Sequence, residues 1–356
     1  MRSKIFFTLI ISFLVSGKIF SQKLEVKSFL QFDLQTETNI RAIEVLNDSV
    51  VWFAGSGGVY SFTNDNGATF TIDSLKADTL IHEFRSIAVL NEYTILLMNA
   101  GSPAYIFKSD DIGVSWKVVY ENDDAEIFFD ALKFADEKNG IAIGDPIRDC
   151  FQIIITHDGG ETWQQVLCKP IPHSLSGEAA FASSNSSIDI IGKSIWFATG
   201  GLHSRVFASQ DLGEHWKVID APIIAGKELT GIFSLDFFDR YNGIIGGGDY
   251  NDKASKISTV AITSDEGKIW KPIAEEDAPP FVSCIQYQPN SAGYNIIAAC
   301  LPGIYLSDNK GLLWTKLPDE NGNEIKSIFY TFRFSPSGKV AWFAGAKGKI
   351  ARLELK

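Results

Sequence analysis

The sequence lacks the short motifs that mark the commonest catalytic machineries. It has no Walker-type phosphate loop and no HExxH, CxxC or GxSxG pattern, so nothing in it supports nucleotide hydrolysis, metalloprotease chemistry or a serine-hydrolase elbow. Histidine is scarce as well, and the five residues of this type are scattered along the chain. We therefore expect no metal site and no cofactor.

Long apolar runs are missing after the N-terminus. The chain begins with two basic residues, Arg2 and Lys4, followed by an apolar run at 5–15 and the small residue Ser21. This order is typical of a signal peptide, so residues 1–21 are predicted to be removed and the mature protein to be extracytoplasmic, either periplasmic or secreted. No later stretch approaches the run of about 18 uncharged apolar residues that a transmembrane helix needs, so we expect no membrane span.

Positive charge is also in short supply. Residues 1–21 carry Arg2, Lys4 and Lys18 and no acid, so their removal takes the formal charge from −11 to −14. An acidic protein repels the phosphate backbone of nucleic acids. Nucleic acid is therefore excluded as an expected partner.

What the sequence does contain is a repeat with the pattern [S/T]xDxGxx[W/F]. Its copies recur at intervals of 44 to 54 residues, a period typical of propeller blades. In such a turn the third residue accepts backbone hydrogen bonds, the glycine takes a positive φ, and the aromatic side chain folds back against a sheet. We interpret the third positions as structural residues. They are Asp65, Asp111, Asp158, Asp211, Asp265 and, in the sixth copy, Asn309.

The repeated turn resembles the Asp-box of the BNR, sialidase-like superfamily of β-propellers. Over most of the mature chain the sequence is similar to photosystem II stability/assembly factor-like proteins of non-photosynthetic bacteria, through GDPIRD at 144–149, GEAAFA at 177–182, ATGG at 198–201 and GGDY at 247–250. The resemblance implies that each box caps the hairpin between the third and fourth strands of a blade, away from the functional face. The Arg-Ile-Pro element of true sialidases is absent, which argues against that activity.

The strands between the boxes predict an all-β fold. Strands that end in glycine recur at 50–55, 194–200 and 341–345, and the last of these belongs to a C-terminal segment with only three strands. A strand at 24–32 precedes the first blade and has no blade of its own. We therefore predict a single domain over residues 22–356, a seven-bladed β-propeller closed by pairing of 24–32 with 348–355. Six blades is the alternative.

The four cysteines predict two disulfides in a secreted chain. Cys150 and Cys168 flank the third box symmetrically, and Cys284 and Cys300 flank the turn at 289–293 in the same way. Antiparallel strands would place the members of each pair opposite each other. We predict the pairs Cys150–Cys168 and Cys284–Cys300, with four buried thiols as the alternative.

The face opposite the boxes is the predicted functional face, because strand direction opens the loops between second and third strands there. Asp145 and Asp249 have the alternative role of capping glycine-rich turns. The expected rim also includes His82, Glu83, Asp130, Asp149 and Asp252. We predict ligand binding by Arg41, Arg85, Arg148, His203, Arg205 and Tyr250 and, if the protein is an enzyme, catalysis by Glu178, Asp145 and Asp249.

Two function classes remain open at this point. The first is a binding or assembly module that presents the loop face to a protein or glycan partner. The second is an exo-acting glycosidase or another carbohydrate-active enzyme, in which acids and arginines meet over the central funnel. Because a fold does not establish chemistry and no complete catalytic signature is present, we favour the binding module.

Overall fold

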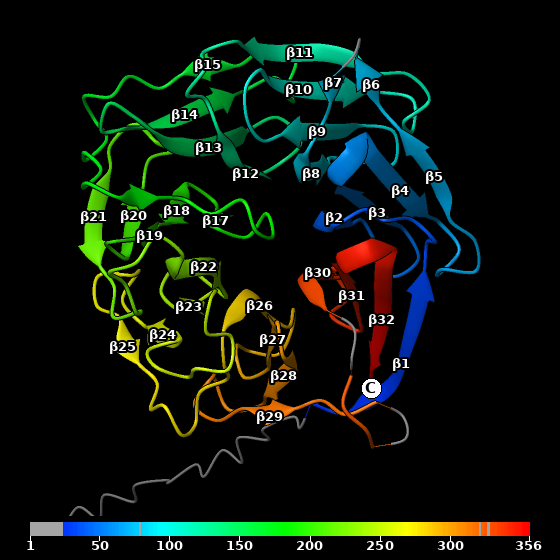
Figure 1. Cartoon of the computed structure of the whole chain (residues 1–356), viewed down its shortest axis with the longest axis vertical. Coiled ribbons are helices and arrows are strands. Elements are labelled where there is room, and N and C mark those ends of the chain that lie inside the picture. Colours follow the sequence, from blue (N-terminus) through cyan, green and yellow to red (C-terminus); the bar gives the residue numbers. More distant parts are fainter. Residues whose placement is uncertain (1–23, 78–79, 320–321, 326–327) are drawn as a thin grey trace, which may run out of the picture.

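The computed structural model describes residues 24–77, 80–319, 322–325 and 328–356, and the predicted signal peptide lies outside them. Seven blades, each built on four antiparallel strands, form a ring around a central channel (Figure 1). The predicted seven-bladed β-propeller is confirmed. Within the described ranges, no helix is both long and apolar enough to cross a membrane.

Each blade is built from the channel outward. Blade 1 contains β2 (Ile40–Val45), β3 (Val51–Gly55), β4 (Val59–Thr63) and β5 (Thr71–Ser74), and blade 2 contains β8 (Phe84–Val89), β9 (Ile95–Asn99), β10 (Ala104–Ser109) and β11 (Lys117–Asn122). Blade 3 contains β12 (Phe129–Phe134), β13 (Gly140–Ile147), β14 (Cys150–Thr156) and β15 (Gln164–Gln165), and blade 4 contains β17 (Ile188–Ile191), β18 (Ser194–Ala198), β20 (Arg205–Ser209) and β21 (Lys217–Asp220).

The remaining blades follow the same order. Blade 5 contains β22 (Thr230–Phe237), β23 (Gly243–Asp249), β24 (Val260–Thr263) and β25 (Lys271–Pro272), and its sheet is extended by β19 (Gly200–Gly201) and β16 (Glu178–Ala179). Blade 6 contains β26 (Val282–Tyr287), β27 (Ile296–Cys300), β28 (Gly303–Ser307) and β29 (Thr315–Lys316). Blade 7 contains β30 (Phe329–Phe334), β31 (Val340–Gly345), β32 (Lys349–Leu355) and β1 (Val26–Asp33). A small hairpin, β6 (Lys76–Ala77) and β7 (Leu80–Ile81), follows blade 1.

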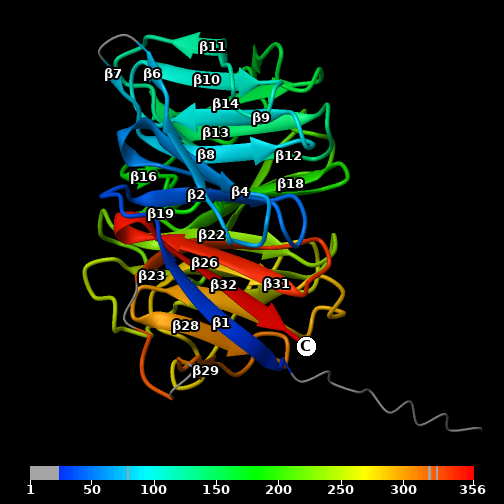
Figure 2. The ribbon, with the colours of Figure 1, turned by 90° about the vertical axis from the view of Figure 1, so that its right-hand side faces the viewer.

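The two ends of the chain close the ring. β1 pairs antiparallel with β32 in a register that runs from Val26 opposite Leu355 to Asp33 opposite Lys349, as predicted (Figure 2). Phe29 anchors the strand, because it is buried and its ring packs edge-on against Phe329 and Phe343, each 6.3 Å away between centroids. Without β1, β32 would present an unpaired edge.

The hydrophobic core lies between neighbouring blades, and the repeated turns hold the blades together. In the second turn, the Asp111 carboxylate accepts hydrogen bonds from the Ser115 hydroxyl and amide and from the Ser109 hydroxyl, and these lower the pKa of Asp111 to about 2. A Cβ atom on Gly113 would lie 3.1 Å from Trp52, so glycine lets this turn lie against the tryptophan of the preceding blade. In the sixth turn, Asn309 Oδ1 accepts the two bonds that correspond to those from the Ser109 hydroxyl and the Ser115 amide, so a side-chain amide replaces the carboxylate there.

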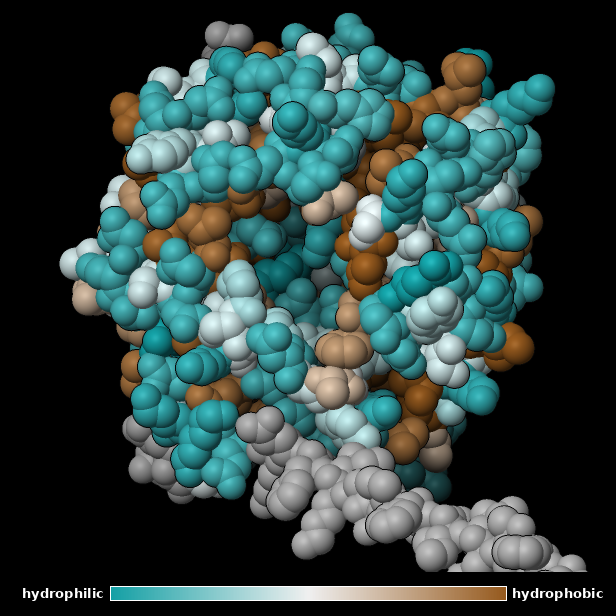
Figure 3. Space-filling model, turned by 180° about the vertical axis from the view of Figure 1, so that it is seen from behind, coloured by the Kyte–Doolittle hydropathy of each residue, from teal (hydrophilic) through white to brown (hydrophobic). Residues whose placement is uncertain are grey.

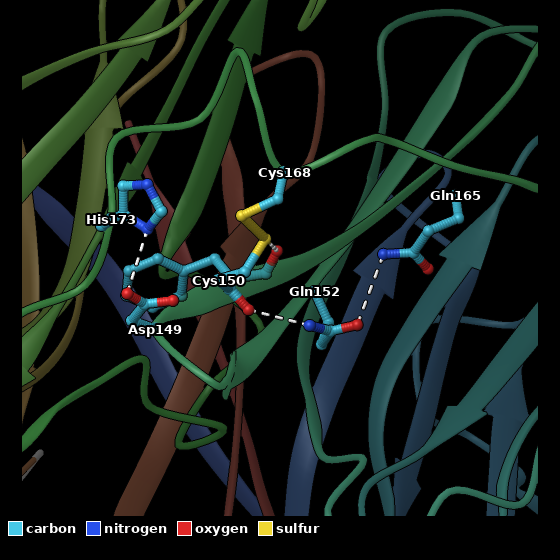
Figure 4. The surroundings of a disulfide bond; sticks show 7 residues. Asp149, Cys150, Gln152, Gln165, Cys168 and His173 are labelled. Carbon is cyan, nitrogen blue, oxygen red and sulfur yellow. Dashed lines mark hydrogen bonds and ion pairs between the residues drawn. A yellow bond between two sulfur atoms is a disulfide. The ribbon is translucent and has the colours of Figure 1, made fainter.

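The disulfide prediction is half right. Cys150 and Cys168 are bonded, with their Cα atoms 5.8 Å apart (Figure 4). The predicted pair Cys284–Cys300 is wrong, because both are buried free thiols. A register shift next to Val282 places Cys284 opposite Ala299 and Cys300 opposite Val282. One residue of offset turns the two side chains to opposite faces of the sheet, so they enter different hydrophobic clusters.

Candidate functional site

The site begins with β-bulges in the innermost strands. The face that carries the 3-10 turns η1 (Ser56–Gly58) and η2 (Ala346–Gly348), toward the viewer in Figure 1, is called the loop face, and the opposite one the box face. Near their loop-face ends, six innermost strands skip one residue in the ladder to the second strand. A bulge of this kind re-aims a side chain. The skipped residues are Arg41, Arg85, Asp130, Phe233, Ser283 and Tyr330.

A pocket of about 320 Å³ opens where several of these residues meet. Arg41, Arg85, Asp130 and Phe233 line it, so bulges from blades 1, 2, 3 and 5 contribute to one cavity. Its other lining residues come from the connections around blades 3 to 5. They are Phe128, Asp145, Ala179, Ala180, Phe181, Ala182, Ser183, Glu228, Leu229 and Tyr250.

The strand-free stretch 182–187, here called the crossing segment, reaches from β17 toward the middle of the ring (Figure 1). It hydrogen-bonds to each of the six other blades. The bonds join Arg41, Arg85, Ile87, Leu132, Ser234, Ser283, Thr331 and Arg333 to backbone or side-chain atoms of residues 182–186. Because six blades bond to one short segment, this segment must lie across the channel. It therefore limits the depth of the pocket.

One wall of the pocket is aromatic. The Phe181 and Phe233 rings stack with their centroids 4.1 Å apart, and Phe281 packs edge-on against Phe233 from behind. Tyr250 continues this wall, since its ring lies 5.7 Å from Phe281. Ala179, Ala180 and Ala182 add only small side chains to the lining. The wall suits an apolar or planar group.

The facing wall carries two guanidinium groups. Arg41 stacks on Tyr330 at 4.1 Å and donates to the Ser183 carbonyl at 3.2 Å, and Arg85 donates to the Ala182 carbonyl at 3.0 Å. Among the described residues, the only ion pair of Arg85 is a 3.9 Å contact with Glu83, and Arg41 makes none. Burial and the neighbouring Arg41 lower the pKa of Arg85. Each guanidinium keeps N–H groups for a ligand.

Two carboxyl groups, those of Asp130 and Asp145, also line the pocket. Asp130 is fully buried, and neither of its oxygens takes part in a hydrogen bond within the described part of the chain; the Ala182 amide approaches them outside hydrogen-bond geometry. Burial, and then the neighbouring Asp145, raise the pKa of Asp130 well above its ordinary value. Asp145 accepts a 2.9 Å hydrogen bond from the Ala180 amide, yet burial raises its pKa to about 6.

Glu178 and Arg205 do not line this pocket but form a buried ion pair beside it. Arg205 Nε donates to Glu178 Oε1 at 2.9 Å, and a second guanidinium nitrogen pairs with Oε2. Glu178 also accepts from the Thr199 hydroxyl at 2.5 Å and the Leu175 amide at 2.8 Å. These four contacts occupy both carboxylate oxygens and fix the segment that leads into the pocket wall.

The other predicted residues lie around the rim. Asp249 pairs with Lys227 at 2.8 Å and accepts from the Asn251 amide, which is the turn-capping role left open above. Arg148 and Asp149 are exposed at positive φ, and Asp149 lies 3.2 Å from His173 near the disulfide (Figure 4). His203 and Asp252 do not line the pocket, whereas Tyr250 does. Of the three candidate catalytic acids, only Asp145 is in the lining.

The box face offers a different environment. Figure 3 shows a central hollow on this face with hydrophilic residues inside. On the box-face side of the crossing segment, ionic groups of four blades interact, and Lys133 lies 3.5 Å from Asp189. Burial and the charge of Asp189 raise the pKa of Asp236, whereas the charges of Lys133 and Arg333 act to lower it. The candidate metal group in the described ranges, Asp211, Glu214 and His215, sits in an exposed box turn, where His215 already pairs with Asp211.

Several site residues were missed by the sequence analysis. Phe128, Phe181, Phe233 and the crossing segment were not predicted, because apolar residues and serines were read as strand and loop. A usable signal exists, since the innermost strands align as IRAI, FRSI, FDAL, IFSL, VSCI and FYTF from residues 40, 84, 129, 232, 282 and 329. The second letter of each word is the residue that the bulge projects, and it is charged in the first three words.

No protein-family model and no curated relative matches the sequence. Among solved structures, the chain is similar to "YCF48 bound to D1 peptide", with 16% identity, a TM-score of 0.67 and coverage of 94% of this chain and 99% of that one. It is also similar to YCF48 from Cyanidioschyzon merolae, at 13% identity and a TM-score of 0.64, with 92% of this chain and 98% of that one covered.

A third similar structure is a catalytic protein. The GH74 xyloglucanase from Xanthomonas campestris has 12% identity and a TM-score of 0.61, over 91% of this chain and 53% of that one. Identities this low establish the fold alone. The shared β-propeller thus occurs both in a protein solved with a bound peptide and in a glycoside-cleaving enzyme.

Proposed function

We propose that this chain is an extracytoplasmic binding module that receives an extended segment of a partner protein in the loop-face pocket. An anionic group of the segment lies beside Arg41 and Arg85, and an apolar or aromatic side chain packs on Phe181 and Phe233. The observation that carries the proposal is a pair of guanidinium groups that line an open pocket and that, among the residues the structure describes, have no carboxylate closer than the 3.9 Å contact of Glu83 with Arg85.

Electrostatics supports an anionic ligand. Burial and the neighbouring Arg41 lower the pKa of Arg85, so the like charges of the two guanidinium groups repel each other at this site. An anion placed between them relieves this repulsion and forms charge-assisted hydrogen bonds, each worth about 1.5–3 kcal/mol. A peptide is favoured over a glycan because a propeller of this shape has been solved with a peptide.

The glycosidase alternative has weaker support. Glycoside cleavage needs two carboxyl groups that reach the same glycosidic bond, at least one of them ionised or easily titrated. Glu178 has both oxygens occupied by Arg205, Thr199 and the Leu175 amide, and Asp249 is paired with Lys227. Asp145 and Asp130 are the two acids that line the pocket, and a glycosidase screen tests whether Asp145 is catalytic.

Binding is expected to depend on the arginine pair. An array of random peptides probed with residues 22–356 should select sequences that combine an acidic side chain or free carboxylate with an aromatic or branched residue. Arg85→Met, which keeps an apolar stem and removes the charge, should weaken binding of a selected peptide by about 10- to 100-fold, measured by isothermal titration calorimetry. Arg240→Met, at an exposed arginine of the box face, is the matched control and should leave the affinity unchanged.

Peptides that lack any anionic group, or equal affinity for wild type and Arg85→Met, would contradict this proposal. Cleavage of an oligosaccharide in the same preparation, abolished by Asp145→Asn, would favour the enzyme instead.

A further inference from the structure

The two acids of the pocket are placed next to each other by paired bulges. Phe129 of β12 pairs with Gly144 of β13, and the next residue on each strand, Asp130 and Asp145, is skipped in its ladder. Both side chains line the pocket. The only hydrogen bond that either carboxyl accepts among the described residues is the one from the Ala180 amide to Asp145. Two desolvated carboxyl groups in this arrangement cannot both ionise cheaply.

The charged groups that face these acids come from every element around the pocket. Arg85 on β8 is the cation that acts on Asp130, and it is shared with Glu83 and opposed by Arg41 on β2. Glu228 lies before β22 and is exposed, whereas Tyr250 after β23 and Tyr330 on β30 bring phenol groups. The other cation of the described lining, Arg41, is not among the groups that act on either acid, so a proton is the remaining counter-charge.

We propose that Asp130 and Asp145 hold at least one proton between them at neutral pH, and that the pocket takes up a further proton when an anionic ligand group binds beside Arg41 and Arg85. This inference rests on the proposed function and adds its regulation: the pocket is a binding site whose affinity rises as the surroundings become more acidic. The ligand class is a carboxylate attached to an apolar or aromatic group.

The direction follows from charge. When Asp145 is ionised, its negative charge opposes an incoming anion. When it is protonated, this repulsion is removed and the neutral carboxyl can itself donate a hydrogen bond to the ligand. Burial raises the pKa of Asp145 to about 6, so this change falls in the range from slightly acid to neutral. By linkage, an anion that prefers the protonated pocket must raise the pKa of the pair and draw in a proton.

The test uses N-acetylphenylalanine as the probe, with its uncharged amide as the matched ligand. Calorimetric titrations of residues 22–356 at pH 5.5 and pH 7.5, each in two buffers of different ionisation enthalpy, give the affinity and the number of protons taken up. The probe should bind about tenfold more weakly at pH 7.5, with net proton uptake near pH 6.5, and the amide should bind weakly at both values. Asp145→Asn should remove the pH dependence and the proton uptake.

Controls separate this inference from the proposed function. Asp123→Asn, at an exposed acid of the loop face outside the pocket, should keep both the pH dependence and the proton uptake. Should Asp145→Asn not fold, the wild-type proton count in the two buffers decides the matter alone. Probe binding that is independent of pH, or accompanied by proton release, would overturn the inference and leave the proposed function standing. If the probe binds at neither pH, the inference is also overturned. If the wild-type protein binds no array-selected peptide, the proposed function itself fails.

Discussion

Replacing Glu178 by Ala is expected to lower the free energy of unfolding by about 3–5 kcal/mol, because it leaves the Arg205 guanidinium buried without its carboxylate. The side chains of Glu178 and Arg205 are 0% and 8% exposed, so water cannot take over the lost contacts. The Thr199 hydroxyl and the Leu175 amide would lose their acceptor as well. Chemical denaturation of wild type and variant measures the difference.

The matched control for this ion pair is Asp33→Ala, which breaks an exposed pair with Lys349 in which both side chains are more than 40% exposed. Exposed pairs are screened by water and contribute little to stability, so this variant should be nearly neutral. A loss below about 1 kcal/mol for Glu178→Ala would contradict the buried ion pair. If stability falls while peptide affinity in the folded fraction is unchanged, Glu178 belongs to the scaffold and not to catalysis.

Removal of residues 22–34 is expected to destabilise the whole ring, because β32 would lose its partner along the full length of β1. The point variant Phe29→Ala isolates the packing component and should cost about 3–5 kcal/mol, as for other buried aromatic residues. Leu30→Ala, on the same strand with a side chain that is 46% exposed, is the control and should cost less than about 1 kcal/mol. Thermal unfolding followed by tryptophan fluorescence and by circular dichroism reports the effect.

The two probes of that experiment should give one common transition for the truncated chain, at a lower temperature than for the full one. A truncated protein that keeps the wild-type midpoint would contradict closure of the ring by β1. So would a separate early transition confined to blade 7.

The architecture could be predicted from the sequence because it depends on repeated local chemistry. The boxes fix one hairpin per blade. The C-terminal segment supplies only three strands, and Phe29 of the N-terminal strand packs against aromatic residues of these strands. What the box pattern did not indicate is that the residue before each glycine also has a positive φ, as Ile112 does at 61°. The pattern places no restriction on that position, so the sequence carries no signal for it.

The site was predicted less well, and for physical reasons. Arg41, Arg85, Asp145 and Tyr250 were expected on the loop face and do line the pocket, because loop position follows from strand direction. Glu178 and Arg205 were predicted to be free functional groups, but they neutralise each other. The error arose because an ion pair between distant residues produces no recognisable spacing in the sequence. The Cys284–Cys300 error has the same origin, because one bulged residue shifts a register that symmetry of the turn cannot reveal.

Amide hydrogen exchange of residues 22–356, with and without an array-selected peptide, tests most directly whether the loop-face pocket is the binding site. The peptide should slow exchange in residues 128–131 and 179–183, two stretches that contribute residues to the pocket lining, and should leave exchange in the box turns unchanged. At a concentration that just saturates wild type, the same peptide should cause much weaker protection in Arg85→Met. Protection confined to the box turns or the outer strands, with none at 179–183, would contradict binding at this pocket.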